Sequence, residues 1–189
     1  MFIMNESDEE IVEKIQHGET DLFVHITERY FDRIFRYTLK MHFGNTQEAE
    51  DSTAETFYKA YRFINSYSSS IPFSAWLYRV AKNTVIDALR KHKRQPKVSL
   101  ELYLEIHDEP RTVVLNTITD EKMLIDTFLE YVDEEERSLL TLHYLEGVPI
   151  RELSDLYKMK ENTITVKIKR AKEKIRKLAE EKGITYYEQ

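Results

Sequence analysis

The sequence predicts an all-α fold of two small helical domains joined by a flexible linker. Glycine and proline number only 4 each among 189 residues, and a turn-rich β fold would need more of both. Apolar residues recur at helical spacing through residues 7–94 and again through 120–182. Between them, residues 97–119 lack a sustained period and contain Pro110. We therefore expect domains at 1–95 and 120–182, a linker at 96–119 and a tail at 183–189.

Four helices are expected in the first domain. They cover roughly residues 7–17, 22–44, 46–64 and 73–93, with a serine-rich loop at 65–72 before the last of them. Ser7 is suited to cap the first helix, because Glu10 stands at the capping-box position three residues later. Asp21 is suited to cap the second helix.

The second domain is also expected to be helical. Its helices are expected at about 120–131, 134–145, 150–157 and 161–181. Asp120 and Asp133 are suited to cap the first two, and Pro149 suits the first turn of the third. A short turn at residues 158–160 joins the last two helices. Two helices joined this way, the second of them basic, are typical of a helix-turn-helix.

The distribution of charge points to nucleic acid although the net charge is −6. Residues 71–97 carry seven basic side chains and one acidic, and residues 158–182 carry ten basic and four acidic. Two basic blocks in an acidic chain describe local electrostatic footprints better than the overall charge does. The alternative is a pair of lysine-rich helix faces that are merely solvated.

The helix expected at 73–93 carries a basic face and an apolar face. Its basic face holds Arg79, Lys82, Asn83, Ile86 and Arg90, and its apolar face holds Leu77, Ala81, Val85 and Ala88. Cations of this kind contact phosphates, and aromatic rings at the start of the helix can stack on unpaired bases. A lone tryptophan in an amphipathic helix usually packs inside, so Trp76 is expected in the core. Tyr78 and Asn83 are the better candidates for DNA contacts.

The last helix repeats this division. Its core stripe is Ile164, Ile168, Ala171, Ile175 and Leu178. A separate face holds Thr163, Val166, Lys167, Arg170 and Lys174, which a recognition helix would present to a major groove.

The order of these segments resembles that of an extracytoplasmic-function (ECF) sigma factor, a compact member of the sigma-70 family of bacterial transcription initiation factors. Residues 49–61 resemble region 2.2, residues 73–94 resemble regions 2.3 and 2.4, and residues 133–179 resemble region 4. The resemblance implies two helical domains. The first, sigma-2, binds the β′ clamp helices of core RNA polymerase and opens the −10 promoter element. The second, sigma-4, binds the −35 element and the β flap.

The resemblance also implies functional residues. It assigns polymerase binding to Asp51, Glu55, Phe57 and Ala60. Contacts with the −10 element fall to Asn65, Ser66, Tyr67, Ser68, Tyr78, Arg79, Lys82, Asn83 and Arg90, and contacts with the −35 element to Thr163, Val166, Lys167, Arg170 and Lys174. The spacing of Asp51 and Glu55 agrees, since carboxylates at i and i+4 suit a basic partner helix, although a solvated acidic face has the same pattern.

The chain departs from the family pattern in its helix-turn-helix turn. That turn usually contains glycine, whereas Tyr157-Lys158-Met159 has none. Either one residue there adopts the left-handed region, at some cost in free energy, or the turn has a different geometry.

Nothing in the sequence indicates catalysis. The chain has no cysteine, which excludes disulfides, thiolate metal sites and cysteine nucleophiles. Neither a phosphate-binding glycine loop nor a metal-binding histidine motif is present, so we expect no enzyme, no cofactor and no metal. The N-terminus lacks a signal-peptide pattern and no apolar run reaches membrane-spanning length, which predicts a cytoplasmic protein without membrane insertion.

Two other functions remain open on the sequence. A stand-alone helix-turn-helix regulator would explain residues 133–182 but would leave the basic helix at 73–94 without a role. A helical adaptor that binds only proteins would make both basic blocks incidental. The sigma-factor resemblance explains both helices, and it implies promoter DNA, core polymerase and an anti-sigma factor as partners.

Overall fold

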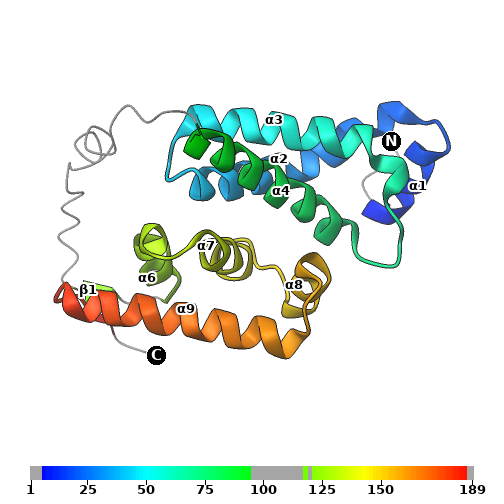
Figure 1. Cartoon of the computed structure of the whole chain (residues 1–189). Helices are drawn as coiled ribbons and strands as arrows, with labels where there is room; N and C mark the ends of the chain where they lie inside the picture. Colours follow the sequence, from blue (N-terminus) through cyan, green and yellow to red (C-terminus); the bar gives the residue numbers. More distant parts are fainter. Residues whose placement is uncertain (1–5, 95–116, 119–120, 187–189) are drawn as a thin grey trace.

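The computed structural model describes residues 6–94, 117–118 and 121–186, and within them the fold is all-α apart from one pair of two-residue strands (Figure 1). The N-terminal half comprises α1 (Asp8–Gln16), η2 (Thr20–Leu22), α2 (Phe23–Met41), α3 (Thr46–Arg62), η3 (Ile64–Ser66) and α4 (Phe73–Arg94). The C-terminal half comprises α6 (Glu121–Phe128), η4 (Leu129–Tyr131), α7 (Glu134–Leu140), η5 (Thr141–Leu145), α8 (Ile150–Tyr157) and α9 (Glu161–Glu181). Most of the expected linker and the cap expected at Asp120 lie outside the described residues.

Local signals set several helix starts as predicted. The capping box of α1 is confirmed: the Ser7 hydroxyl accepts from the Glu10 amide, and the Glu10 carboxylate accepts from the Ser7 amide at 2.8 Å. The predicted cap at Asp133 is confirmed as a second capping box, with Glu136 as its partner. The cap at Asp21 is wrong, because a short 3₁₀ turn containing Asp21 precedes α2 and leads directly into it.

The helix expected at 134–145 changes from α-helical to π-helical hydrogen bonding halfway along. α7 ends at Leu140, and residues 141–145 continue as the π-helical segment η5. The amide of Glu146 donates to the carbonyl of Thr141 at 3.0 Å, which is the wider π-type hydrogen bond. Gly147 follows with φ +71°, a conformation that favours glycine. The chain thereby turns sharply before α8, and Glu146 lies at the corner.

A short parallel pair of strands joins the two ends of the C-terminal half. β1 (Thr117–Ile118) pairs with β2 (Thr185–Tyr186), with Thr117 opposite Thr185. These residues were expected in the linker and the tail, which the periodicity of the sequence left without structure. Two residues per strand give no alternation from which a strand could be predicted.

The two halves pack against one another and their buried side chains form one continuous cluster. Figure 1 shows the N-terminal half above the C-terminal half, with α4 facing α7 and α8. At the centre of the contact, the Ser138 hydroxyl lies 2.8 Å from the Tyr37 hydroxyl and accepts from the Tyr157 hydroxyl at 2.6 Å. Burial raises the pKa of both tyrosines, so both stay neutral. We call this packing the closed arrangement.

No helix among the described residues is both long enough and apolar enough to cross a bilayer.

Candidate nucleic-acid interface

Part of the basic face of α4 is turned toward the C-terminal half. Arg79 donates from its guanidinium to the backbone carbonyl of Asp155 at 2.6 Å. The Lys82 ammonium lies 4.1 Å from the centre of the Tyr157 ring, and burial lowers the pKa of this lysine. Ser74, at the start of α4, donates to the Glu152 carboxylate at 2.6 Å. In the closed arrangement α8 therefore occupies part of the surface predicted to read the −10 element.

Tyr78 is fully buried rather than presented to solvent. Its ring lies 6.1 Å from that of Tyr37, and the Arg33 guanidinium lies 5.7 Å from its centre. Burial raises the pKa of Tyr78 to about 12. The predicted DNA contact by Tyr78 is thus impossible in the closed arrangement. Helical spacing put Tyr78 beside the basic face but carried no information about α2, against which its ring packs.

Asn83 and Arg90 remain exposed on α4. Arg90 makes only a long ion pair with Asp87, at 4.0 Å, in which both side chains are more than half exposed. Such a pair contributes little stability and leaves the guanidinium available. Asn83 and Arg90 are thus the predicted −10 contacts of α4 that are exposed in the closed arrangement, whereas Arg79 and Lys82 are half-buried.

The loop before α4 combines a buried aromatic residue with exposed polar ones. Tyr67 packs edge-on against Phe73 and Trp76, and its hydroxyl donates to the Ile71 carbonyl at 2.9 Å. Trp76 is a core residue, as predicted. Tyr67 was predicted to contact DNA, but its burial makes it the internal support of the loop. Asn65, Ser66 and Ser68 are exposed, so polar groups line the outer side.

The predicted polymerase contacts on α3 divide between surface and core. Asp51 and Glu55 are exposed, and Glu55 makes an i, i+4 ion pair with Lys59 at 3.4 Å. Phe57 and Ala60 are buried, so they can act only by supporting the helix. The intervening residues Ser52 and Thr56 face the interior as well; the Ser52 hydroxyl lies 2.7 Å from the His42 ring nitrogen.

Aromatic surface beside these carboxylates was missed by the sequence reasoning. Phe31, Tyr58 and Tyr61 are about half exposed, at 47%, 56% and 45%. Phe31 stacks on Phe57, with ring centres 6.3 Å apart. Large apolar side chains in this setting are typical of protein-binding surfaces. A signal was present in the sequence, since Tyr58 lies between the predicted contact residues Phe57 and Ala60.

α9 presents its predicted recognition face to solvent. Thr163, Val166 and Arg170 are exposed. Lys167 pairs with Glu135 at 3.0 Å, and Lys174 pairs with Glu136 at 2.9 Å. Two of the three cations are therefore partly neutralised by carboxylates at the start of α7. Exposed pairs of this kind are weak and can be exchanged for phosphates.

The turn before α9 has the predicted left-handed residue. Lys158 adopts φ +54° and ψ +42° at the end of α8. The Met159 amide donates to the Ser154 carbonyl, and the Ser154 hydroxyl donates to the Met159 carbonyl. These two bonds satisfy the end of α8 and offset the strain of a non-glycine residue at this φ. α8 and α9 thus form a helix-turn-helix without the usual glycine.

Glu146 joins the two halves electrostatically, which was not predicted from the sequence. Its carboxylate accepts two hydrogen bonds from Arg36, each at 2.9 Å, and its backbone carbonyl accepts from Arg33 at 3.3 Å. The side chain is 1% exposed although both arginines reach solvent. A bidentate pair of this type is the strongest form of side-chain ion pair. The π-helical corner at residues 141–146 places the carboxylate there.

In the described part of the chain, no three histidine, cysteine or carboxylate side chains converge to hold a metal ion.

The fold and its two basic helices define a helical protein with two nucleic-acid-binding parts, one in each half. Comparison with protein families agrees: residues 26–95 match Sigma-70 region 2, and residues 122–175 match Sigma-70 region 4. The chain belongs to the sigma-70 family of transcription initiation factors, in its ECF group. A stand-alone helix-turn-helix regulator is not favoured, because the region 2 match covers the N-terminal half.

Relatives of similar length support this membership. The chain is 28% identical over 181 residues to the ECF RNA polymerase sigma factor SigW of Bacillus subtilis, covering 88% of this chain and 93% of that one. It is 27% identical over 187 residues to the RNA polymerase sigma-H factor of Pseudomonas aeruginosa, covering 93% and 95%.

Solved structures show the same fold at lower identity. CnrH, solved in complex with the cytosolic domain of CnrY, is 18% identical with a TM-score of 0.68, covering 93% of this chain and 98% of that one. The sigma factor RpoE from Bartonella quintana, solved with the anti-sigma factor NepR, is 16% identical with a TM-score of 0.61, covering 84% and 96%.

Proposed function

We propose that this sigma factor directs core RNA polymerase to promoters through three surfaces on different elements. α3 binds the polymerase, the loop at 65–72 together with α4 reads and opens the −10 element, and α9 reads the −35 element. The observation that carries the proposal is the exposed basic face of α9, on the second helix of a helix-turn-helix inside the region 4 match. Base edges are read from the start of such a helix and phosphates along its length.

The polymerase-binding surface that we assign extends beyond the predicted carboxylates. Asp51 and Glu55 supply negative charge for a basic partner helix, while Phe31, Tyr58 and Tyr61 supply apolar area beside them. Charge steers the encounter and fixes the register, whereas buried aromatic area supplies most of the affinity. The β′ clamp helices are the partner we assign to this surface, and the β flap is the partner of the C-terminal half.

Reading of the −10 element requires the closed arrangement to open. Arg79 and Lys82 are directed at α8, and Tyr78 lies beneath them. In the open form Arg79 and Lys82 would be free for single-stranded DNA, whose phosphates attract the cations. Tyr78 also packs against Tyr37 and Arg33 of its own half, so opening alone does not free its ring. Opening must break the Glu146–Arg36 pair, which is therefore one of the polar contacts opposing activation. Polymerase and promoter favour the open form because they bind its newly exposed surfaces.

An anti-sigma factor is the inhibitory partner that we assign. The Bartonella protein of similar fold was solved with such a factor. A partner that binds both halves in the closed arrangement would stabilise it by mass action and keep α4 covered. We further propose that the protein acts in the cytoplasm, where polymerase is found, and that it catalyses no reaction of its own.

Run-off transcription tests this function directly. Purified core polymerase with this protein should transcribe a subset of a randomised promoter library, and the selected sequences should share two motifs separated by a fixed spacer. The protein without core polymerase should bind promoter DNA only weakly. Selection of a duplex operator by the protein alone would overturn the proposal and support a stand-alone regulator.

A further inference from the structure

α1 lies outside the region 2 match, which begins at residue 26, yet it contacts the loop at 65–72 and the start of α4. Its apolar face, formed by Ile11, Val12 and Ile15, is buried in the core of the N-terminal half. Its polar side chains form hydrogen bonds with the backbone at both ends of the loop, so α1 contacts the loop as well as the core.

Gln16 binds the beginning of the loop. Its side-chain amide nitrogen donates to the carbonyl of Ile64 at 2.8 Å and to the carbonyl of Tyr67 at 3.1 Å. The two N–H groups of one amide thus satisfy two acceptors three residues apart in the chain. Because Asn65 and Ser66 lie between these carbonyls, their backbone is fixed from beneath while their side chains face solvent.

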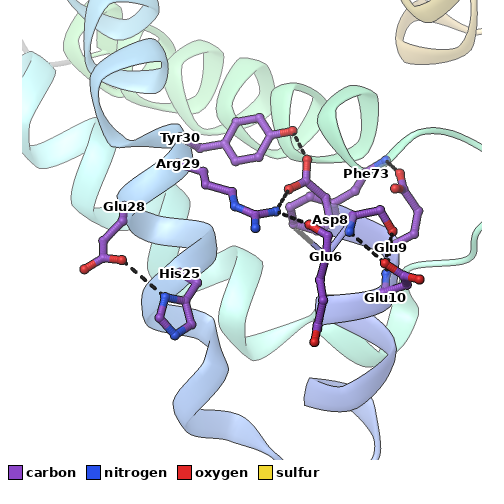
Figure 2. A network of polar contacts seen from close by, with 10 residues as sticks. Glu6, Asp8, Glu9, Glu10, His25, Glu28, Arg29, Tyr30 and Phe73 are labelled. Atoms are coloured by element: carbon purple, nitrogen blue, oxygen red, sulfur yellow. Dashed lines mark hydrogen bonds and ion pairs between the residues drawn. The ribbon is translucent and has the colours of Figure 1, made fainter. Parts of the chain in front are cut away.

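Glu9 binds the end of the loop (Figure 2). Its carboxylate accepts from the backbone amide of Phe73 at 2.9 Å, and Phe73 is the first residue of α4. The preceding residue, Pro72, has no side-chain acceptor and cannot cap the helix itself. Glu9 therefore provides the cap from another helix, and its negative charge also suits the positive end of the α4 dipole.

α1 is itself held firmly at its start (Figure 2). The Asp8 carboxylate accepts from the Arg29 guanidinium at 2.8 Å and from the Tyr30 hydroxyl, both on α2. Arg29 also donates to the backbone carbonyl of Glu6 at 2.9 Å. Glu9, next to Asp8, is consequently placed against α4 by contacts that do not involve the loop.

We infer that α1 positions the loop that reads the −10 element, with Gln16 and Glu9 as the positioning residues. The inference rests on the proposed function of that loop. A loop held at both ends loses less conformational entropy when it binds a flipped or unstacked base. The same contacts between loop and DNA therefore give tighter DNA binding. Loss of either contact should leave the exposed side chains of the loop intact but poorly placed.

Two substitutions with matched controls separate positioning from general stability. Gln16→Glu keeps the size of the side chain and removes both donors, while Glu9→Ala removes the cap. Glu9→Gln retains an acceptor oxygen and should restore function, and Glu13→Gln, on the exposed side of α1, is the control. Hydrogen exchange of the loop amides in the free protein reports on positioning, and permanganate reactivity of −10 thymines in the polymerase complex reports on opening.

We expect loop exchange to rise in Gln16→Glu and Glu9→Ala. The equilibrium constant for opening should fall roughly three- to tenfold for each hydrogen bond lost, one in Glu9→Ala and two in Gln16→Glu. Binding of the complex to a duplex −35 probe should not change. Unchanged loop exchange would overturn the inference, and so would raised exchange with normal opening. The double variant Asn65→Ala/Ser68→Ala tests the loop assignment itself; if it opens promoters normally, the proposed −10 role of the loop fails and the role of α1 with it.

Discussion

α4 and α9 are both long amphipathic helices with a basic face, yet in the closed arrangement the two basic faces differ in exposure. On α4, Arg79 and Lys82 are directed at α8. α9 lies on the far side of the C-terminal half from α4 and presents Arg170 to solvent (Figure 1). Equal charge patterns therefore do not imply equal access to DNA. Access is set by which helix the other half covers.

The difference suits the chemistry of the two elements. Reading a duplex in its major groove requires an exposed helix and no rearrangement of DNA. Opening a duplex requires aromatic and cationic groups that would also bind single strands without discrimination. Covering α4 until polymerase is bound would prevent such binding, whereas α9 needs no cover.

The largest expected effect is on α9. The double substitution Lys167→Ala/Arg170→Ala removes two cations from the exposed face and should reduce transcription from −35-dependent promoters by about 10- to 100-fold. The slope of binding against salt should also fall by about one for each lost phosphate contact. Lys169→Ala, an exposed lysine outside the predicted face, is the matched control. Unchanged run-off transcription in the double variant would refute the recognition face.

A smaller effect is expected at the contact between the halves. Glu146→Ala removes the bidentate pair with Arg36; because Arg36 is 55% exposed, we expect a loss of about 1–2 kcal/mol from the closed arrangement, a factor of roughly 5–30. The free protein should then bind a single-stranded −10 oligonucleotide more tightly by the same factor, measured by fluorescence anisotropy. Glu130→Ala, at an exposed carboxylate, should change nothing. Equal affinities for Glu146→Ala and the unsubstituted protein would show that this pair does not oppose opening.

The smallest effect concerns the titration of Tyr78. Burial raises its pKa to about 12, so its contribution to stability is complete below the ordinary tyrosine pKa near 10 and is lost as the pH rises toward 12. Tyr78→Phe lacks this titration, and its free energy of unfolding should fall less steeply over that range. Denaturant titrations at several pH values give the slopes, with Tyr61→Phe as the exposed control. Equal slopes for Tyr78→Phe and the unsubstituted protein would place Tyr78 in contact with water.

Features that depend on neighbouring residues were predicted from the sequence. The capping boxes at Ser7 and Asp133, the packing of Trp76 and the left-handed residue at 157–159 all depend on residues a few positions apart. The same holds for the fold class and for the division of α9 into an apolar and a basic face.

The covered face of α4 was not predictable, since it depends on residues far apart in the chain. Arg36 and Glu146 are separated by 110 positions, and their contact requires the π-helical corner before Gly147. Gln16 and Tyr67 are 51 positions apart. Periodicity reports which face of a helix is apolar but not which other element packs on its polar face.

The distance between the halves tests the central claim most directly. The chain has no cysteine, so Glu50→Cys and Lys169→Cys create two unique labelling sites on exposed residues of α3 and α9. Single-molecule energy transfer should give one high-efficiency population for the free protein and a lower efficiency after core polymerase is added. A free protein with the same low efficiency as the polymerase complex would contradict the account, because α4 would then be uncovered before any partner binds.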